Sequence, residues 1–104
     1  MQQLRLNITF DPAKDEANRA KHGLSLLEAA RLHWDWLLCH PDVRRDYREL
    51  REVGFAPLAD RVHCVVFVQQ GSTLRIISLR RANAREVNQY DQALHEVRLH
   101  RPDA

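Results

Sequence analysis

The 104-residue chain has room for one compact domain with a single core, which excludes a two-domain architecture. Apolar residues make up 44% and charged residues 29% of the chain, and this balance excludes an intrinsically disordered protein. The net charge of +2 is too small to indicate a nucleic-acid partner by itself, but residues 61–104 hold seven basic and four acidic side chains, against nine and ten in residues 1–60.

The first two predicted elements are a strand and a short helix. Apolar side chains at every second position from residue 4 to residue 10 predict a strand with one buried face. Asp11 suits the N-cap of a helix, Pro12 suits its first turn, and Gly23 suits the left-handed conformation that ends a helix. The sequence therefore predicts a helix over residues 12–22.

A second helix and a short strand are expected next. Ser25 and Glu28 have the spacing of a capping box, and the apolar residues that follow predict a helix to about residue 33. The apolar run at residues 36–39 is too short for a helix, so we expect a strand there and a turn at residues 40–42.

The second half of the chain carries the clearest strand pattern. Residues 49–56 are expected to form a strand before the breaker Pro57. The β-branched runs at residues 62–68 and 74–79, joined across residues 70–72, predict a hairpin in the middle of the sheet.

The last expected element is a C-terminal helix. Asn83 and Glu86 match a second capping box, and apolar residues then recur at three- and four-residue steps to Val97. Pro102 is expected to end the ordered part, which leaves a disordered tail at residues 101–104.

This order of elements predicts an α+β fold in a single domain over residues 1–100. The expected sequence is one strand, two helices, about four antiparallel strands and a C-terminal helix, with one face of the sheet covered. The N-terminal residues contain no apolar run long enough for a signal peptide, so a cytoplasmic protein without a membrane partner is expected. In that compartment Cys39 and Cys64 are expected to be reduced thiols.

Metal and nucleotide chemistry are not expected. The adjacent pairs at residues 39–40 and 63–64 combine cysteine with histidine, but neighbouring strand residues point to opposite faces, so each pair offers one ligand where structural zinc takes four. The apolar surroundings of Cys64 favour an inert thiol, and the chain has no glycine-rich phosphate loop. We therefore expect neither a metal nor another cofactor.

Arginines at the end of the second hairpin strand are candidates for an anion site. Arg80 and Arg81 precede the predicted C-terminal helix, whose first amides would favour an anion. Strand alternation predicts that Arg75 and Arg81 share one face and that Arg80 lies on the other, unless the strand ends at Leu79. Exposed charges that merely end a strand are the alternative interpretation.

Lys21 and His22 are the candidates for proton transfer. Histidine titrates near neutral pH, and both side chains can contact a phosphate. A purely structural interpretation is also open, because cations at the C-terminus of a helix interact favourably with the helix dipole.

Several of these residues together resemble one family. The stretches concerned are Phe-Asp-Pro-Ala-Lys at 10–14, Asn18, Lys-His-Gly at 21–23, Arg-Ile-Ile-Ser-Leu-Arg-Arg-Ala at 75–82, Glu86 and Tyr90. In order and spacing they resemble the BrnT toxins over about residues 8–90. Where that family often has an arginine, five residues before Gly54, this chain has Glu49, with Arg48 and Arg51 close by.

The resemblance implies a RelE-like fold and the toxin half of a type II toxin-antitoxin pair. Such a toxin is a metal-independent endoribonuclease that cleaves RNA and arrests translation and growth. The implied partner is a BrnA-like antitoxin with a ribbon-helix-helix region, and promoter DNA is contacted only through the antitoxin complex.

Metal-free cleavage needs a base for the 2′-hydroxyl, cations for the phosphate and a donor for the 5′-oxygen. As a hypothesis, the catalytic residues are Lys21, His22, Arg80 and Arg81. Two further arginines, Arg51 and Arg75, are expected to be secondary RNA contacts. A non-catalytic nucleic-acid-binding module, a degenerate toxin and a purely structural partner protein are the alternatives.

Overall fold

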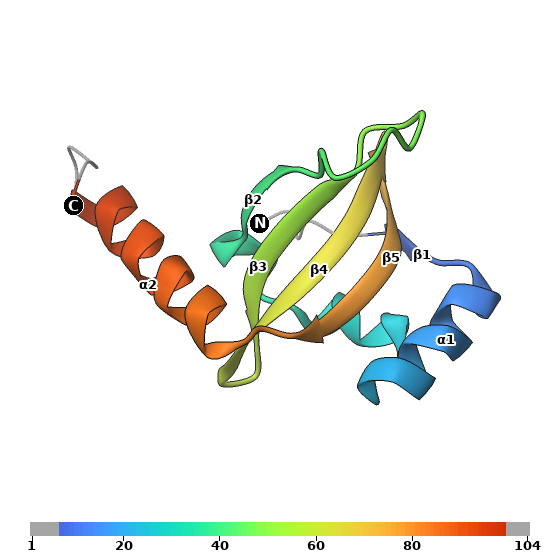
Figure 1. Cartoon of the computed structure of the whole chain (residues 1–104), viewed down its shortest axis with the longest axis horizontal. Coiled ribbons are helices and arrows are strands. Elements are labelled where there is room, and N and C mark those ends of the chain that lie inside the picture. The colour runs from blue at the N-terminus through green and yellow to red at the C-terminus, as the bar shows by residue number, and fades with distance from the viewer. Residues whose placement is uncertain (1–6, 100–104) are drawn as a thin grey trace, which may run out of the picture.

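The computed structural model describes residues 7–99 as an α+β fold built around one five-stranded sheet (Figure 1). The elements in chain order are β1 (Asn7–Thr9), α1 (Pro12–His22), η1 (Leu26–Arg31), η2 (Trp34–Trp36), β2 (Leu38–Pro41), β3 (Glu52–Leu58), β4 (Arg61–Gln70), β5 (Thr73–Arg81) and α2 (Ala84–Leu99). The helices η1 and η2 are 3₁₀ helices. The tail predicted at residues 101–104 and the first half of the strand predicted at 4–10 lie outside the described residues.

The hairpin of β4 and β5 lies in the middle of the sheet, as predicted. The strand order is β1-β5-β4-β3-β2, and the four strands from β2 to β5 pair antiparallel to their neighbours. The short strand β1 instead pairs parallel to the first three residues of β5, so the sheet is mixed. Gly71, with a φ of 61°, supplies the left-handed residue that the turn between β4 and β5 requires.

One face of the sheet carries the apolar core, and η1 covers it. The fully buried Val65, Ile76 and Leu79 of the hairpin belong to the same cluster as Leu26 of η1. The ring of Phe67 meets that of Trp34 edge to face, with 5.5 Å between the centroids. These contacts hold η1 and η2 against the sheet.

The second predicted helix is wrong in type. Residues 26–31 form a 3₁₀ helix, in which the amide of Leu32 donates to the Ala29 carbonyl at 3.2 Å. A 3₁₀ helix has about three residues per turn. This period places Leu26, Ala29 and Leu32, all of them buried, on one side against the sheet, while Leu27 remains 62% exposed.

Two strand boundaries also differ from the predictions. The strand expected at residues 49–56 is β3, Glu52–Leu58, which starts later, after the left-handed backbone of Arg48 with a φ of 58°. It also runs through Pro57, which was expected to end it, because Pro57 lies beyond the last residue that pairs with β2. The strand in the apolar run at 36–39 is β2, Leu38–Pro41, which begins only after η2.

The helix predicted over residues 12–22 is confirmed as α1, and the C-terminal helix is confirmed as α2. The predicted capping box of α2 is present: the Glu86 amide donates to Asn83 Oδ1 at 2.8 Å, and the Asn83 amide donates to Glu86 Oε1 at 2.9 Å. Figure 1 shows that α2 leaves the end of β5 and extends away from the sheet, on the side opposite α1. Buried Tyr90 ties α2 back, because its hydroxyl donates to the Trp36 carbonyl at 2.7 Å.

Candidate active site

Helix α1 is attached to the edge of β5 by one buried side chain. Asn18, only 5% exposed, donates from Nδ2 to the Leu79 carbonyl at 2.8 Å and accepts at Oδ1 from the Leu79 amide at 3.1 Å. Since β1 pairs only with residues 73–75, the later part of β5 has no strand on this side. Buried backbone groups need partners, and the Asn18 amide supplies them.

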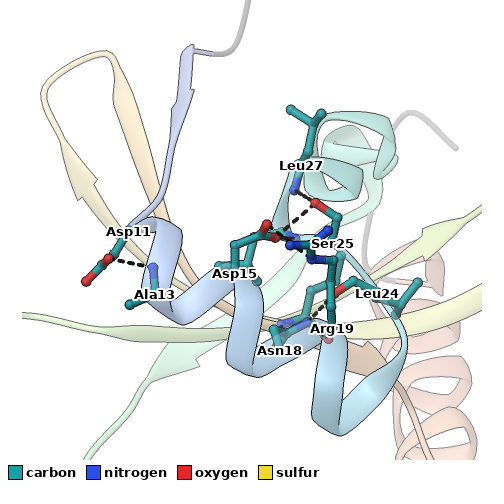
Figure 2. A network of polar contacts seen from close by, with 10 residues as sticks. Asp11, Ala13, Asp15, Asn18, Arg19, Leu24, Ser25 and Leu27 are labelled. Atoms are coloured by element: carbon teal, nitrogen blue, oxygen red, sulfur yellow. Dashed lines mark hydrogen bonds and ion pairs between the residues drawn. The ribbon is translucent and has the colours of Figure 1, made fainter.

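A second network ties α1 to the segment that follows it. Asn18 Nδ2 also donates to the Leu24 carbonyl at 2.9 Å, and Asp15 accepts from the Ser25 hydroxyl at 2.9 Å and from the Leu26 amide at 2.7 Å (Figure 2). The bond from the Leu26 amide, supported by Ser25 and Arg19, lowers the pKa of the Asp15 carboxyl. These contacts fix α1 and its C-terminus with respect to β5.

The last turn of α1 carries Lys21 and His22, and it ends at Gly23 with a φ of 72°. His22 follows Asn18 by four residues, so both lie on the same side of the helix, toward β5. Partial burial lowers the pKa of His22, and the positive charges of Lys21 and Arg80 lower it further. A neutral imidazole is therefore favoured beside two cations. We call the group of Lys21, His22 and Arg80 the junction site.

The arginines of β5 do not alternate as predicted. The register of β4 and β5 shifts between Val66 and Phe67, so that Leu79 and Ile76, three residues apart, both belong to the core. A regular strand would place them on opposite faces. Arg75 therefore shares a face with Arg80, and Arg81 lies on the core face. The prediction that Arg75 and Arg81 share a face is wrong, because sequence alternation alone cannot locate a bulge.

Arg80 is held by a carboxylate. Its two terminal nitrogens donate to the two carboxylate oxygens of Glu86, each at 2.8 Å, and Nη1 also donates to the Arg81 carbonyl at 3.2 Å. This pair lowers the pKa of the Glu86 carboxyl and raises that of Arg80. Glu86 is thus both part of the α2 cap and the group that orients Arg80.

Arg81 belongs to a different site. With His63, its partner across the β4–β5 pair, it lines a pocket with a cavity volume of about 310 Å³ between η1 and the β3–β4 turn. The ionisable residues that line it are Glu28, Arg31, Asp60, Arg61, His63 and Arg81. We call it the His63 pocket. The structure thus separates two arginines that were predicted to act together.

The two predicted RNA-binding arginines do lie together, around Glu49. Arg75 donates to Glu49 Oε1 at 2.7 Å, and Arg51 lies 3.7 Å from the same oxygen. The Arg51 guanidinium also lies over the ring of Tyr47, 4.1 Å from its centroid. The Nε atoms of Arg51 and Arg75 are buried without a hydrogen-bond partner. One carboxylate therefore faces two guanidinium groups.

His63 and Glu86 were given no role in the sequence-based mechanism. His63 shares the inward face of β4 with Val65 and Phe67, so a polar side chain in an apolar alternation was the available signal. Glu86 was recognised only as a cap. Its distance to Arg80 depends on how α2 leaves the sheet, which no local pattern shows.

Other sequence candidates are placed as follows. Cys39 is exposed and Cys64 is buried, and both are free thiols. Burial raises the pKa of Cys64, as it does that of Cys39, where Glu52 adds to the effect. Within residues 7–99 no group of three or more potential ligands could hold a metal ion, and no helix is long and apolar enough to cross a membrane.

Comparison with known families decides the class of this protein. Residues 10–86 match the model of the ribonuclease toxin BrnT of type II toxin-antitoxin systems, which covers α1, the sheet from β2 to β5, and the start of α2. The chain belongs to this family. No curated protein matches it. As a BrnT-family ribonuclease toxin it has an antitoxin as its implied partner, and its junction site lies inside the matched region.

Proposed function

We propose that the chain is a metal-independent endoribonuclease that cleaves RNA at the junction site. The observation that carries the proposal is that Asn18 holds the last turn of α1, with His22, against Leu79 of β5, the residue before Arg80. A neutral imidazole can accept a proton, and a fixed guanidinium can stabilise a crowded phosphate.

In the proposed reaction His22 accepts the proton of a ribose 2′-hydroxyl, whose oxygen attacks the adjacent phosphorus. The bond from phosphorus to the 5′-oxygen breaks, and Lys21 protonates the departing oxygen. The products are a 2′,3′-cyclic phosphate and a 5′-hydroxyl. Arg80 stabilises the negative charge that develops on the phosphate, because its guanidinium stays positively charged throughout the reaction. For the same reason Arg80 cannot act as the base.

The Arg80–Glu86 pair supports this role. A guanidinium has about five N–H donors, and three hydrogen bonds to Glu86 and Arg81 occupy only part of them. The remaining donors can bind phosphate oxygens while Glu86 keeps the fork in one orientation. Glu86 is therefore a positioning residue.

Further RNA contacts are assigned to Arg51 and Arg75. Together with Glu49 they carry a net charge of +1, which attracts a phosphate. Arg81 binds RNA from the other face of the sheet. These contacts hold the RNA chain rather than perform the chemistry.

The cellular role follows from the reaction and the family. Cleavage of RNA in the cytoplasm arrests translation and growth until a BrnA-like antitoxin with a ribbon-helix-helix region binds the toxin. Promoter DNA is bound only through that complex. The fold that we propose for the chain is RelE-like.

The test is induced expression in bacteria, with total RNA examined for fragments. The wild-type chain is compared with Arg80→Ala and with Arg45→Ala, which removes an exposed arginine between β2 and β3. Loss of an electrostatic stabiliser lowers the rate of cleavage about 10²–10³-fold. Bacteria that express Arg80→Ala should therefore grow normally and keep their RNA intact. Arg45→Ala should behave as wild type. Equal arrest and fragmentation by all three proteins contradicts the proposal, and normal growth with soluble wild-type protein favours a degenerate toxin or a binding module.

A further inference from the structure

The His63 pocket is large enough to hold a small ligand. Its cavity volume of about 310 Å³ is at the lower end of the range that small-molecule sites occupy. It is open to solvent, yet the histidine at its wall is only 4% exposed.

The hydrogen bonding of His63 determines which ring nitrogen is left to bind a ligand. Nδ1 lies 2.9 Å from the Arg61 carbonyl, within the range of a hydrogen bond. A carbonyl only accepts, so Nδ1 carries the proton and donates to it. In the neutral ring, Nε2 then keeps its lone pair and can accept a hydrogen bond from a ligand.

The charges around the pocket favour an anion with a polar edge. Arg31 is paired with Glu28 at 3.5 Å, whereas neither Arg61 nor Arg81 forms an ion pair within the described part of the chain. Two guanidinium groups are therefore available for phosphate oxygens. The carboxylates of Glu28 and Asp60 can accept only, which suits the amino groups of a nucleobase.

The pocket and the junction site take neighbouring residues of the chain, although they lie on opposite faces of the sheet. Arg81 directly follows Arg80, and Leu24, which also lines the pocket, comes two residues after His22. For one RNA chain to contact both Arg80 and the pocket, it has to pass around the end of β5. One strand end thus contributes consecutive arginines to two neighbouring places along the same RNA.

We propose that the His63 pocket binds one nucleotide of the RNA and determines the base preferred beside the cleaved bond. Its phosphate lies on Arg61 and Arg81, and its base presents a donor to His63 Nε2. This inference rests on the proposed function for the identity of the ligand, but the pocket residues do not take part in bond breaking.

The test is binding of a 2′-O-methyl oligoribonucleotide, which lacks the attacking hydroxyl and cannot be cleaved. Fluorescence anisotropy at several salt concentrations compares the wild type with Arg61→Gln and the matched control Arg45→Gln. Loss of a phosphate contact should weaken binding about tenfold and reduce the slope of log Kd against log salt by about one unit. The control should stay within about twofold of wild type, because it removes the same charge outside the pocket.

A second variant tests base selection. His63→Gln is expected to redistribute the cleavage positions while thermal unfolding confirms that the protein is folded. Wild-type affinity and salt slope in Arg61→Gln overturn the proposal, as do unchanged cleavage positions in folded His63→Gln. If a free mononucleotide binds the pocket as tightly as the oligonucleotide does, the ligand is a free nucleotide and the RNA assignment is wrong. The binding experiment does not depend on cleavage. If Arg61→Gln weakens binding but the wild-type protein does not cleave RNA, only the proposed catalysis is contradicted.

Discussion

Arg80 and Arg81 are consecutive in the chain, yet they lie in unlike surroundings on opposite faces of the sheet. Arg80 is held by both oxygens of Glu86 and is 36% exposed, whereas Arg81 is exposed and lines the His63 pocket without a carboxylate partner in the described chain. A strand therefore delivers two identical side chains to two different sites. In the proposed reaction the fixed arginine stabilises the phosphate that reacts, and the open arginine binds RNA.

The bulge at the middle of β5 determines whether Arg75 shares a face with Arg80 or with Arg81. The bulge keeps Leu79 and Ile76 on the core face although they are three residues apart, and it brings Arg75 to the face of Arg80. Without the extra residue, Arg75 would lie on the face of Arg81. On one face of β5, Arg75 and Arg80 have carboxylate partners. On the other face, Arg81 lines the His63 pocket.

The largest expected difference is between lysine variants at the two positions. Arg80→Lys keeps the charge but loses the bidentate fork, so the rate of cleavage should fall about 100-fold or more. Arg81→Lys keeps a cation in an open pocket, and we expect a loss of less than about tenfold, mostly in KM. Single-turnover cleavage by the purified proteins measures both. Equal losses in the two variants would show that the arginines act as one site.

The next largest effect concerns the attachment of α1 to β5. Asn18→Ala removes the partners of the buried Leu79 amide and carbonyl, and each unsatisfied group costs about 1–3 kcal/mol. We expect a loss of about 3 kcal/mol in the free energy of unfolding, measured with denaturant. Asn88→Ala, at an exposed position of α2, is the control and should change it by less than about 0.5 kcal/mol. A stability unchanged from wild type would mean that the edge of β5 does not need α1.

The pH dependence of cleavage sharpens the electrostatic side of the comparison. A proton on His22 blocks its action as a base, so the rate should rise with pH through a pKa below the ordinary 6.5. Lys21→Gln removes one of the charges that lower this pKa, so the rise should move to higher pH even though the maximal rate falls. Lys14→Gln, in the first turn of the same helix, serves as the control. A profile of kcat/KM that keeps its midpoint in Lys21→Gln would contradict the assignment of His22.

The smallest expected effect is at the anchor of α2. Tyr90→Phe removes the hydrogen bond to the Trp36 carbonyl and should cost about 1 kcal/mol of stability. If α2 merely orients Glu86 through its first turn, cleavage should remain within about twofold of wild type. Thermal unfolding and cleavage of the same preparation check both statements. A large loss of cleavage would show that the whole helix takes part in placing Arg80.

The sequence predicted the elements whose signals are local. The caps at Asp11 and Asn83, the alternation in β4 and the turn at Gly71 each depend on neighbours in the chain, and the structure contains all of them. The 3₁₀ form of η1 was missed because its choice between 3₁₀ and α depends on the sheet that it covers. The same holds for the bulge, which appears only when two strands pair.

The site was less predictable than the fold. Lys21, His22 and Arg80 were named from residue type, and in the structure the charges of Lys21 and Arg80 both lower the pKa of His22. Arg81 was grouped with Arg80 because the two are adjacent in sequence, although a strand sends neighbours to opposite faces. Glu86 and His63 depend on contacts between different elements of the fold, which a single sequence does not reveal.

The measurement that tests the central claim most directly is the chemistry of the RNA ends. Purified protein is incubated with an oligoribonucleotide in the presence of a chelator, beside a substrate with a single 2′-deoxy position at the cleaved bond. The account predicts cleavage of the first substrate to a 2′,3′-cyclic phosphate and a 5′-hydroxyl, and no cleavage of the second. Cleavage at the deoxy position, or products with a 3′-hydroxyl and a 5′-phosphate, would contradict attack by the 2′-hydroxyl at the junction site.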